Sequence, residues 1–270
     1  MDYKMIALDL DGTLTNSEKK ISARTRDVLI DIQKQGAKVV LATGRPINGA
    51  VELSRELEMD VYGGYILAFN GGLIQDCRTG EVIFRKEIPA AYIPELGAAS
   101  RKYQVPIVTY RGDEILTEDT TDKYVRLEAG INKMPIRELQ DFSAEVDFPV
   151  IKCLMVADGW YLEEVLPGMK KSFGDRLNIF RSEPYFMEIT PLGVHKAAGL
   201  EALLKYTGIR REELIAVGDG YNDISMIQFA GLGAAMENAQ PDVKAVADVM
   251  TESNDNDGVA YIVEKYMKNT

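Results

Sequence analysis

Short apolar runs alternate with amphipathic stretches at both ends of this chain. Apolar runs bounded by polar or turn-forming residues predict buried strands, and they lie at 5–8, 38–42, 65–69, 214–217, 233–236 and 249–250, with a hairpin-like pair at 73–74 and 82–84. Helical periodicity and capping residues predict helices over 21–35, 46–57, 196–206, 223–229, 241–247 and 258–266. Strands that alternate with helices pair in parallel. Residues 1–84 and 190–270 therefore predict an α/β core with a doubly wound, Rossmann-like parallel sheet.

The middle of the chain, residues 85–189, follows a different pattern. Helices are expected over 93–103, 122–129 and 161–173, and strands over 106–110, 115–117, 150–156, 177–181 and 186–189. Paired strands with interspersed helices are typical of an antiparallel α+β unit. The segment is far too long for a loop. We expect a second domain inserted into the first, which agrees with the two domains that 270 residues suggest.

Polar clusters follow three of the core strands directly. Asp9-Leu10-Asp11-Gly12-Thr13 follows the run at 5–8, Thr43-Gly44-Arg45 follows 38–42, and Gly218-Asp219-Gly220-Tyr221-Asn222-Asp223 follows 214–217. In an open parallel sheet, ligands bind at the carboxyl ends of the strands. We expect the three clusters to meet at one edge of the sheet, where their carboxylates and hydroxyls could hold a metal ion and a phosphate.

Asp9 and Asp11 are two residues apart at the end of a strand. This spacing directs both carboxylates to the same side of an extended backbone, and two such groups repel each other unless a cation joins them. Magnesium suits the pair, since it takes carboxylate oxygens together with substrate phosphate. The alternative is a turn with two solvated aspartates, or a calcium loop.

Asp219 and Asp223 are spaced to lie on one face of a helix that begins at a strand end. We expect Asp219 to be a direct metal ligand and Asp223 to orient either metal-bound water or a nearby ammonium group. The alternative is a pair of acids that cap the helix and interact favourably with its dipole.

The remaining candidates depend on their context. Thr43 and Gly44 could bind phosphate oxygens at a helix start, or simply cap that helix, and Arg45 could contact substrate or pair with an acid. Lys196 stands at a helix start just after the inserted segment. His195 is the only histidine, and we expect it to be a bystander, since no Ser-His or Cys-His arrangement accompanies it.

Composition restricts the partners. The formal charge is −11, from 31 Lys and Arg against 42 Asp and Glu, which argues against nucleic acid and anionic membranes because both favour basic surfaces. No apolar run reaches the length of a membrane span. Cys77 and Cys153 form no Cys-x-x-Cys pair and no secretory signal opens the sequence. We expect reduced thiols and a cytoplasmic location.

With these residues in place, the chain resembles the haloacid dehalogenase (HAD) superfamily, specifically its Cof-type (IIB) sugar-phosphatase branch. The Asp9–Leu14 segment is similar to the first family motif, Thr43-Gly44-Arg45 to the second, Lys196 to the third and Gly218–Asp223 to the fourth. Asn70-Gly71-Gly72 resembles the Asn-Gly turn of this branch, and the inserted segment is similar to its type-2B cap. Ala197 stands where a glycine is usual.

The resemblance implies a magnesium-dependent phosphatase for small phosphomonoesters, sugar phosphates foremost. Asp9 would be the nucleophile and form an aspartyl-phosphate, and Asp11 would be the general acid and base. Asp9, the Asp11 backbone carbonyl and Asp219 would hold the metal ion. Thr43, Gly44, Arg45, Asn70, Lys196 and Asn222 would bind the phosphate or the rest of the substrate. The cap would select the leaving group, with Tyr124, Arg126, Glu128 and Glu188 as unranked candidates.

Two other functions fit the same residues. A phosphomutase can use this scaffold, and a regulator that binds sugar phosphates could retain a vestigial site. Dehalogenation is disfavoured, because that chemistry lacks the second aspartate and needs no magnesium. The resemblance implies a small phosphorylated metabolite as the partner, and it specifies neither the identity of that metabolite nor the oligomeric state.

Overall fold

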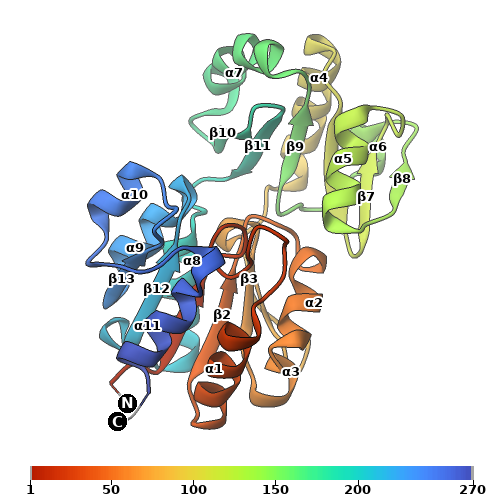
Figure 1. The fold of residues 1–270 in the computed structure, drawn as a ribbon. Coiled ribbons are helices and arrows are strands. Elements are labelled where there is room, and N and C mark those ends of the chain that lie inside the picture. The colour runs from red at the N-terminus through yellow and green to blue at the C-terminus, as the bar shows by residue number, and fades with distance from the viewer. Residues whose placement is uncertain (1, 269–270) are drawn as a thin grey trace. The chain divides into compact units, whose positions relative to one another are not determined.

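The computed structural model describes residues 2–268. Within this part of the chain, eight strands form one sheet in the order β14-β13-β12-β1-β2-β3-β4-β5 (Figure 1). The strands are β1 (Met5–Leu8), β2 (Lys38–Ala42), β3 (Tyr65–Ala68), β4 (Leu73–Asp76), β5 (Val82–Arg85), β12 (Leu214–Gly218), β13 (Leu232–Ala235) and β14 (Val249–Met250). Pairing is parallel from β14 to β3 and antiparallel between β3 and β4. The predicted α/β fold with a mainly parallel core sheet is confirmed.

Helices cover both faces of this sheet. Every residue of β1 and β12 is buried, which requires packing on both sides. Helix α1 packs beside α11, and α8 packs beside α9. The elements are α1 (Ala23–Lys34), α2 (Asn48–Glu56), α3 (Met59–Tyr62), α8 (Lys196–Thr207), α9 (Ile224–Phe229), α10 (Pro241–Val246) and α11 (Gly258–Tyr266), with short 3₁₀ turns η1 (Phe69–Gly71), η3 (Arg211–Glu213), η4 (Tyr221–Asp223) and η5 (Asn254–Asn256). Helix α1 begins after Ser22, whose side chain accepts a hydrogen bond from the Thr25 N–H and so caps the helix.

A second sheet, in the order β10-β11-β9-β6-β7-β8, organises the middle of the chain. Its strands are β6 (Ile107–Arg111), β7 (Glu114–Thr117), β8 (Ile136–Glu138), β9 (Cys153–Val156), β10 (Leu177–Glu183) and β11 (Phe186–Pro191). The accompanying helices are η2 (Ala90–Tyr92), α4 (Ile93–Tyr103), α5 (Lys123–Asn132), α6 (Phe142–Glu145) and α7 (Gly159–Phe173). The expected antiparallel sheet is mixed, because β7 and β8 run parallel.

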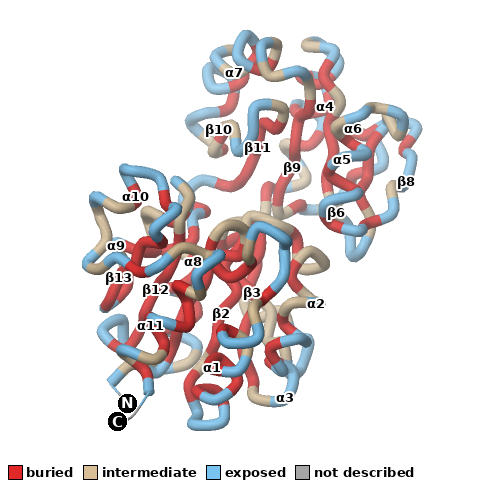
Figure 2. The backbone as a smooth tube through the Cα atoms, viewed as in Figure 1, coloured by how far each residue is buried: buried red, intermediate tan, exposed pale blue. Residues whose placement is uncertain are grey.

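The chain divides into two compact units, residues 1–84 with 195–270 and residues 85–194. Each unit has its own buried strands and helix faces (Figure 2). The sequence-based cap segment of 85–189 ends earlier than the second unit, because β11 continues to Pro191 and the Asn178 side chain donates to the Pro191 carbonyl.

Candidate active site

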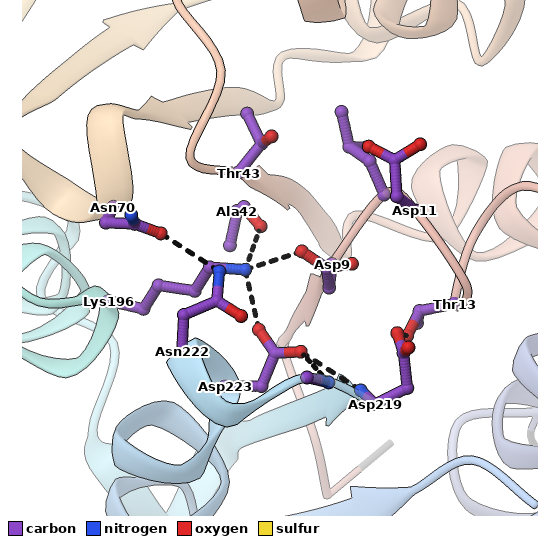
Figure 3. A network of polar contacts seen from close by, with 12 residues as sticks. Asp9, Asp11, Thr13, Ala42, Thr43, Asn70, Lys196, Asp219, Asn222 and Asp223 are labelled. Carbon is purple, nitrogen blue, oxygen red and sulfur yellow. Dashed lines mark hydrogen bonds and ion pairs between the residues drawn. The ribbon is translucent and has the colours of Figure 1, made fainter. Parts of the chain in front are cut away.

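The register of the central strands brings the three polar clusters together. Leu8, the last residue of β1, pairs with Val217 of β12 on one side and with Leu41 of β2 on the other. The residues that follow each strand therefore leave the sheet at the same edge, as the parallel topology predicts. Asp9, Thr43 and Asp219 all lie there (Figure 3).

The Lys196 ammonium joins the clusters. It is fully buried and donates to Asp9 Oδ1 at 2.6 Å, to Asp223 Oδ1 at 2.6 Å and to the Ala42 carbonyl at 2.7 Å (Figure 3). Three acceptors match the three protons of an ammonium group. The site thus contains a fixed positive charge between two carboxylates.

His195 supports this arrangement without touching the acids. It is the N-cap of α8, and its Nδ1 accepts a hydrogen bond from the Ala198 N–H at 3.2 Å. Lys196 is therefore the first residue of a capped helix, which fixes where its side chain starts. This capping role could not be predicted from the residue pattern, because histidine is not among the residues usually preferred as N-caps.

Asp223 anchors the lysine from the other side. Its Oδ1 accepts from Lys196, and its Oδ2 accepts from the backbone N–H groups of Asp219 and Gly220 at 3.0 and 2.8 Å. Gly218 allows this closeness, since a Cβ there would lie 2.5 Å from the Asp223 Cβ. Both oxygens of Asp223 are therefore engaged, and its role in orienting the ammonium or metal-bound water stays a prediction.

Asp219 contacts the first motif. The Thr13 hydroxyl donates to Asp219 Oδ1 at 2.6 Å. Gly12 lies against the same carboxylate with φ of +85°, and a Cβ there would come within 2.4 Å of Asp219 Oδ2. Glycine is therefore required here both for the backbone conformation and for space.

Burial and mutual repulsion raise the pKa values of two acids of the site, Asp9 and Asp219. Burial, followed by the charge of Asp223, raises the pKa of Asp9 to about 8, and Lys196 counteracts this only in part. Burial also raises the pKa of Asp219 to about 6. Burial would lower the pKa of Lys196, but Asp223 and Asp9 outweigh it and raise that pKa, so the ammonium stays charged.

These acids fit a divalent cation. One carboxylate oxygen from each of Asp9, Asp219 and Asp223 lies within 4.8 Å of the others. All are hard oxygen ligands of the kind that magnesium prefers. When ionised, three carboxylates outnumber the single ammonium, and a divalent ion would offset the repulsion among them.

Asp11 lies apart from this cluster. Its Oδ1 pairs with Arg45 at 2.6 Å and with Lys19 at 2.9 Å. Burial raises the pKa of Asp11, but the hydrogen bond from Lys19 and the charge of Arg45 outweigh that effect and lower it. Of the two interpretations of Arg45, pairing with an acid is the one seen. The contact of Lys19 with Asp11 was not predicted. Lys19 lies in a loop and has a left-handed backbone conformation, with φ of 61°, that no sequence pattern indicates.

The second motif and the Asn-Gly turn are also close together. Thr43 Oγ1 accepts from the Arg45 N–H at 3.1 Å, which forms the turn into α2. Asn222 Nδ2 donates to Asn70 Oδ1 at 3.1 Å (Figure 3). A Cβ at Gly44 would lie 3.2 Å from the Asn70 amide. Figure 3 places Thr43, Asn70 and Asn222 around Lys196 and the acids, and Gly44 lies against Asn70. The contacts of all four residues with substrate stay predictions.

The cap candidates each have partners in their own unit. Tyr110 donates to Glu128, Lys152 pairs with Glu188 at 2.9 Å, and Tyr124 donates to Asp158. Arg126 donates to the Thr120 carbonyl. None of these contacts ranks one candidate above another, so a role in specificity stays a prediction.

The fold and the site together define a known class of protein. The family model for haloacid dehalogenase-like hydrolases matches residues 6–263, so the chain belongs to that family. Within it the chain falls in the Cof-type subclass IIB, and it is an enzyme of the HAD phosphatase type.

Three relatives show the likeness. A haloacid dehalogenase-like hydrolase from Bacteroides thetaiotaomicron shares 50% identity with a TM-score of 0.92, covering 97% of this chain and 99% of that one. A subclass IIB sugar phosphatase shares 28% identity with a TM-score of 0.79, covering 97% and 98%. The 5-amino-6-(5-phospho-D-ribitylamino)uracil phosphatase YcsE of Bacillus subtilis is 31% identical over 99% of this chain and 97% of its own length.

No helix in residues 2–268 combines the length and apolar character that crossing a bilayer requires.

Proposed function

We propose that this phosphatase depends on magnesium and hydrolyses small phosphorylated polyhydroxy compounds, sugar phosphates foremost, through an aspartyl-phosphate on Asp9. Two relatives support the substrate class, because one is a sugar phosphatase and the other acts on a phosphorylated ribityl compound. The chemistry of the site supports the reaction class.

The contacts of Asp9 carry the proposal. Lys196 holds Asp9 Oδ1, while no donor within residues 2–268 bonds to the other oxygen, Oδ2. Asp9 is 8% exposed, although the lysine beside it is fully buried. One oxygen is therefore fixed and the other is open to attack phosphorus, which is the arrangement an oriented carboxylate nucleophile needs.

The reaction then follows from the residues present. Asp9 Oδ2 would attack phosphorus and the bond to the leaving oxygen would break. Asp11, which pairs with Arg45 and Lys19 in the free protein, would have to leave these partners and take up a proton on substrate binding before giving that proton to the leaving oxygen. A water would next attack the phosphorus of the aspartyl-phosphate and lose a proton to Asp11, and the bond to Asp9 would break. Lys196 and the Thr43 hydroxyl would hold phosphoryl oxygens. Magnesium, held by Asp9, Asp219 and the Asp11 carbonyl, would offset the repulsion between nucleophile and phosphate.

Phosphate release tests this proposal. The protein is stripped with EDTA and assayed against a panel of sugar phosphates, sugar-alcohol phosphates and p-nitrophenyl phosphate, with and without added magnesium. We expect free phosphate only with the metal. Isomerised sugar phosphate without net phosphate release would indicate a mutase, and binding without turnover would indicate a regulator.

The variant Asp9→Asn isolates the nucleophile. Its amide keeps the shape of the side chain but cannot attack phosphorus, so we expect kcat to fall at least about a thousandfold. The matched control is Asp27→Asn, because Asp27 is an exposed acid on α1 that pairs with its neighbour Arg26. Substantial turnover by Asp9→Asn would contradict covalent catalysis at this residue.

A further inference from the structure

Residues 236–240 form a turn that bridges the two halves of the expected metal site. On the β12 side, the Met236 N–H donates to the Gly218 carbonyl at 3.1 Å, and the Gln240 N–H donates to the Asp219 carbonyl at 3.0 Å. On the β1 side, Asn238 Nδ2 donates to the Gly12 carbonyl at 2.8 Å. The turn is thus hydrogen-bonded to both segments that would supply the metal ligands.

The Gly12 carbonyl is a sensitive point of attachment. Gly12 lies between Asp11, whose carbonyl is an expected ligand, and Thr13, whose hydroxyl holds Asp219 at 2.6 Å. Its φ of +85° belongs to the region that glycine enters freely. Glycine has no side chain whose contacts could restrict the backbone at this point. The hydrogen bond from the Asn238 amide therefore restricts the peptide that joins Asp11 to Thr13.

A second asparagine holds the first. The Asn254 N–H donates to Asn238 Oδ1 at 3.0 Å, and Asn254 Nδ2 donates to the Thr15 carbonyl at 2.9 Å. The Asn238 oxygen accepts from a backbone N–H and its nitrogen faces a carbonyl, so only one orientation of the amide satisfies both contacts. Asn254 therefore fixes the direction in which Asn238 donates.

We propose that Asn238 is a positioning residue for the divalent-cation site: its amide, oriented by Asn254, holds the Gly12 carbonyl and so sets the Asp11 and Thr13 backbone against Asp219. The inference rests on the proposed metal-dependent function. Asn238 itself touches none of the three clustered carboxylates. Groups that act in this way through a ligand's neighbours typically alter metal affinity by about tenfold to a hundredfold.

Manganese(II) binding without substrate measures the effect directly. Titration followed by electron paramagnetic resonance gives Kd for the full-length protein and its variants. We expect Asn238→Ala to raise Kd by about tenfold, the lower end of the range because the amide is partly in solvent. Asn254→Ala should raise it less, since its backbone N–H remains. Thermal unfolding of each variant is recorded alongside.

Ser17→Ala is the matched control. The Ser17 hydroxyl donates to Asp255 Oδ2 at 2.6 Å. This contact attaches the segment between β1 and α1 next to Asn254, away from the expected ligands. We expect its Kd to equal that of the unaltered protein. An equal rise in Ser17→Ala and Asn238→Ala would overturn the inference, since general loosening of the loop would then explain both.

The remaining outcomes are also decisive. A Kd for Asn238→Ala within about twofold of the unaltered protein would overturn the inference. If that variant does not fold, Asn254→Ala decides, and an unchanged Kd there would overturn it. Absence of manganese binding by the unaltered protein would instead refute the proposed metal-dependent function, so the two failures are distinct.

Discussion

At the scale of single residues, the buried Lys196 ammonium is the feature on which the site depends. A buried charge is expensive unless it is paired and hydrogen-bonded. Lys196 meets both conditions, with two carboxylates and a carbonyl within 2.7 Å. Its removal would leave Asp223, which is fully buried, facing Asp9 without a cation.

We expect Lys196→Met to lose activity by at least about a hundredfold, because phosphoryl oxygens and Asp9 would both lack the ammonium. Breaking a buried pair of this kind also costs about 3 to 5 kcal/mol of unfolding free energy. The measurements are kcat with p-nitrophenyl phosphate and urea unfolding. Lys205→Met is the control, since Lys205 lies on the same helix and pairs with Glu201 at the surface.

The double variant Lys196→Met with Asp223→Asn separates the two effects. Removing the unpaired charge should restore part of the stability and none of the activity. Recovery of activity would contradict a direct role for the ammonium.

The sequence predicted the acids of the site better than their partners. Asp9, Lys196, Asp219 and Asp223 could be placed together because strand ends and helix starts fix them. The pairing of Asp11 with Lys19, and of Gly12 with Asn238, depends on loop conformations that carry no periodic signal. Such contacts are set by tertiary structure and could not be predicted from residue patterns.

At the scale of elements, Glu213 links the N-terminal ends of two central strands, β1 and β12. It ends η3 just before β12 and accepts from the Arg210 N–H at 2.9 Å. Lys4, just before β1, pairs with it at 2.6 Å and also donates its N–H to the Glu213 carbonyl. The Arg210 guanidinium also donates to Glu213 Oε1, at 3.1 Å. This side-chain hydrogen bond, and then that from the Lys4 ammonium, lower the pKa of Glu213 from near 4.5 to about 2.

The lowered pKa gives a pH signature. An acid whose pKa is lower in the folded than in the unfolded state stabilises the fold above its unfolded pKa, and loses this effect as pH falls through its folded pKa. We therefore expect Glu213→Gln to lower Tm at pH 7, with a difference that shrinks between about pH 4.5 and pH 2. Thermal unfolding across this range measures it.

Glu201→Gln is the control for this prediction, because Glu201 only pairs with Lys205 at the surface of α8. Its effect on Tm should be small throughout. A Glu213→Gln difference that stays constant down to pH 2 would contradict the linkage.

Element prediction succeeded where apolar runs were long enough. The strands at 5–8 and 214–217 are found in place, and the helix expected over 21–35 is found at Ala23–Lys34. The short elements α3, α6 and β8 were not predicted. They have three or four residues each, too few for a periodic pattern, and β8 is defined only by its pairing with β7.

At the scale of the whole molecule, the described residues fall into two compact units, each with buried hydrophobic residues of its own. Every acid in the candidate metal site belongs to the unit of residues 1–84 and 195–270. One of the two hydrophobic clusters of the other unit includes residues of α4, α6 and α7, with Leu162 fully buried in it. The mixed strand order of the second sheet could not be predicted from the sequence, because parallel pairing of β7 and β8 requires tertiary contacts.

We expect Leu162→Ala to lower the stability of residues 85–194 by about 2 to 5 kcal/mol through the cavity it leaves, while the Kd for manganese stays unchanged. Urea unfolding and the manganese titration test the two halves of the prediction. The control is Leu127→Ala, because Leu127 is exposed on α5 of the same unit. Weaker metal binding in Leu162→Ala would show that the cores are coupled.

The order of segments along the chain has a consequence for biosynthesis. β1 lies between β2 and β12, yet β12 is separated from it by the whole inserted unit. A ribosome therefore releases β1 and β2 long before the strand that closes the other side of β1. Until then the nascent polypeptide exposes an unpaired strand edge, which is prone to aggregation and to capture by chaperones. Activity can emerge only after translation passes Asp223.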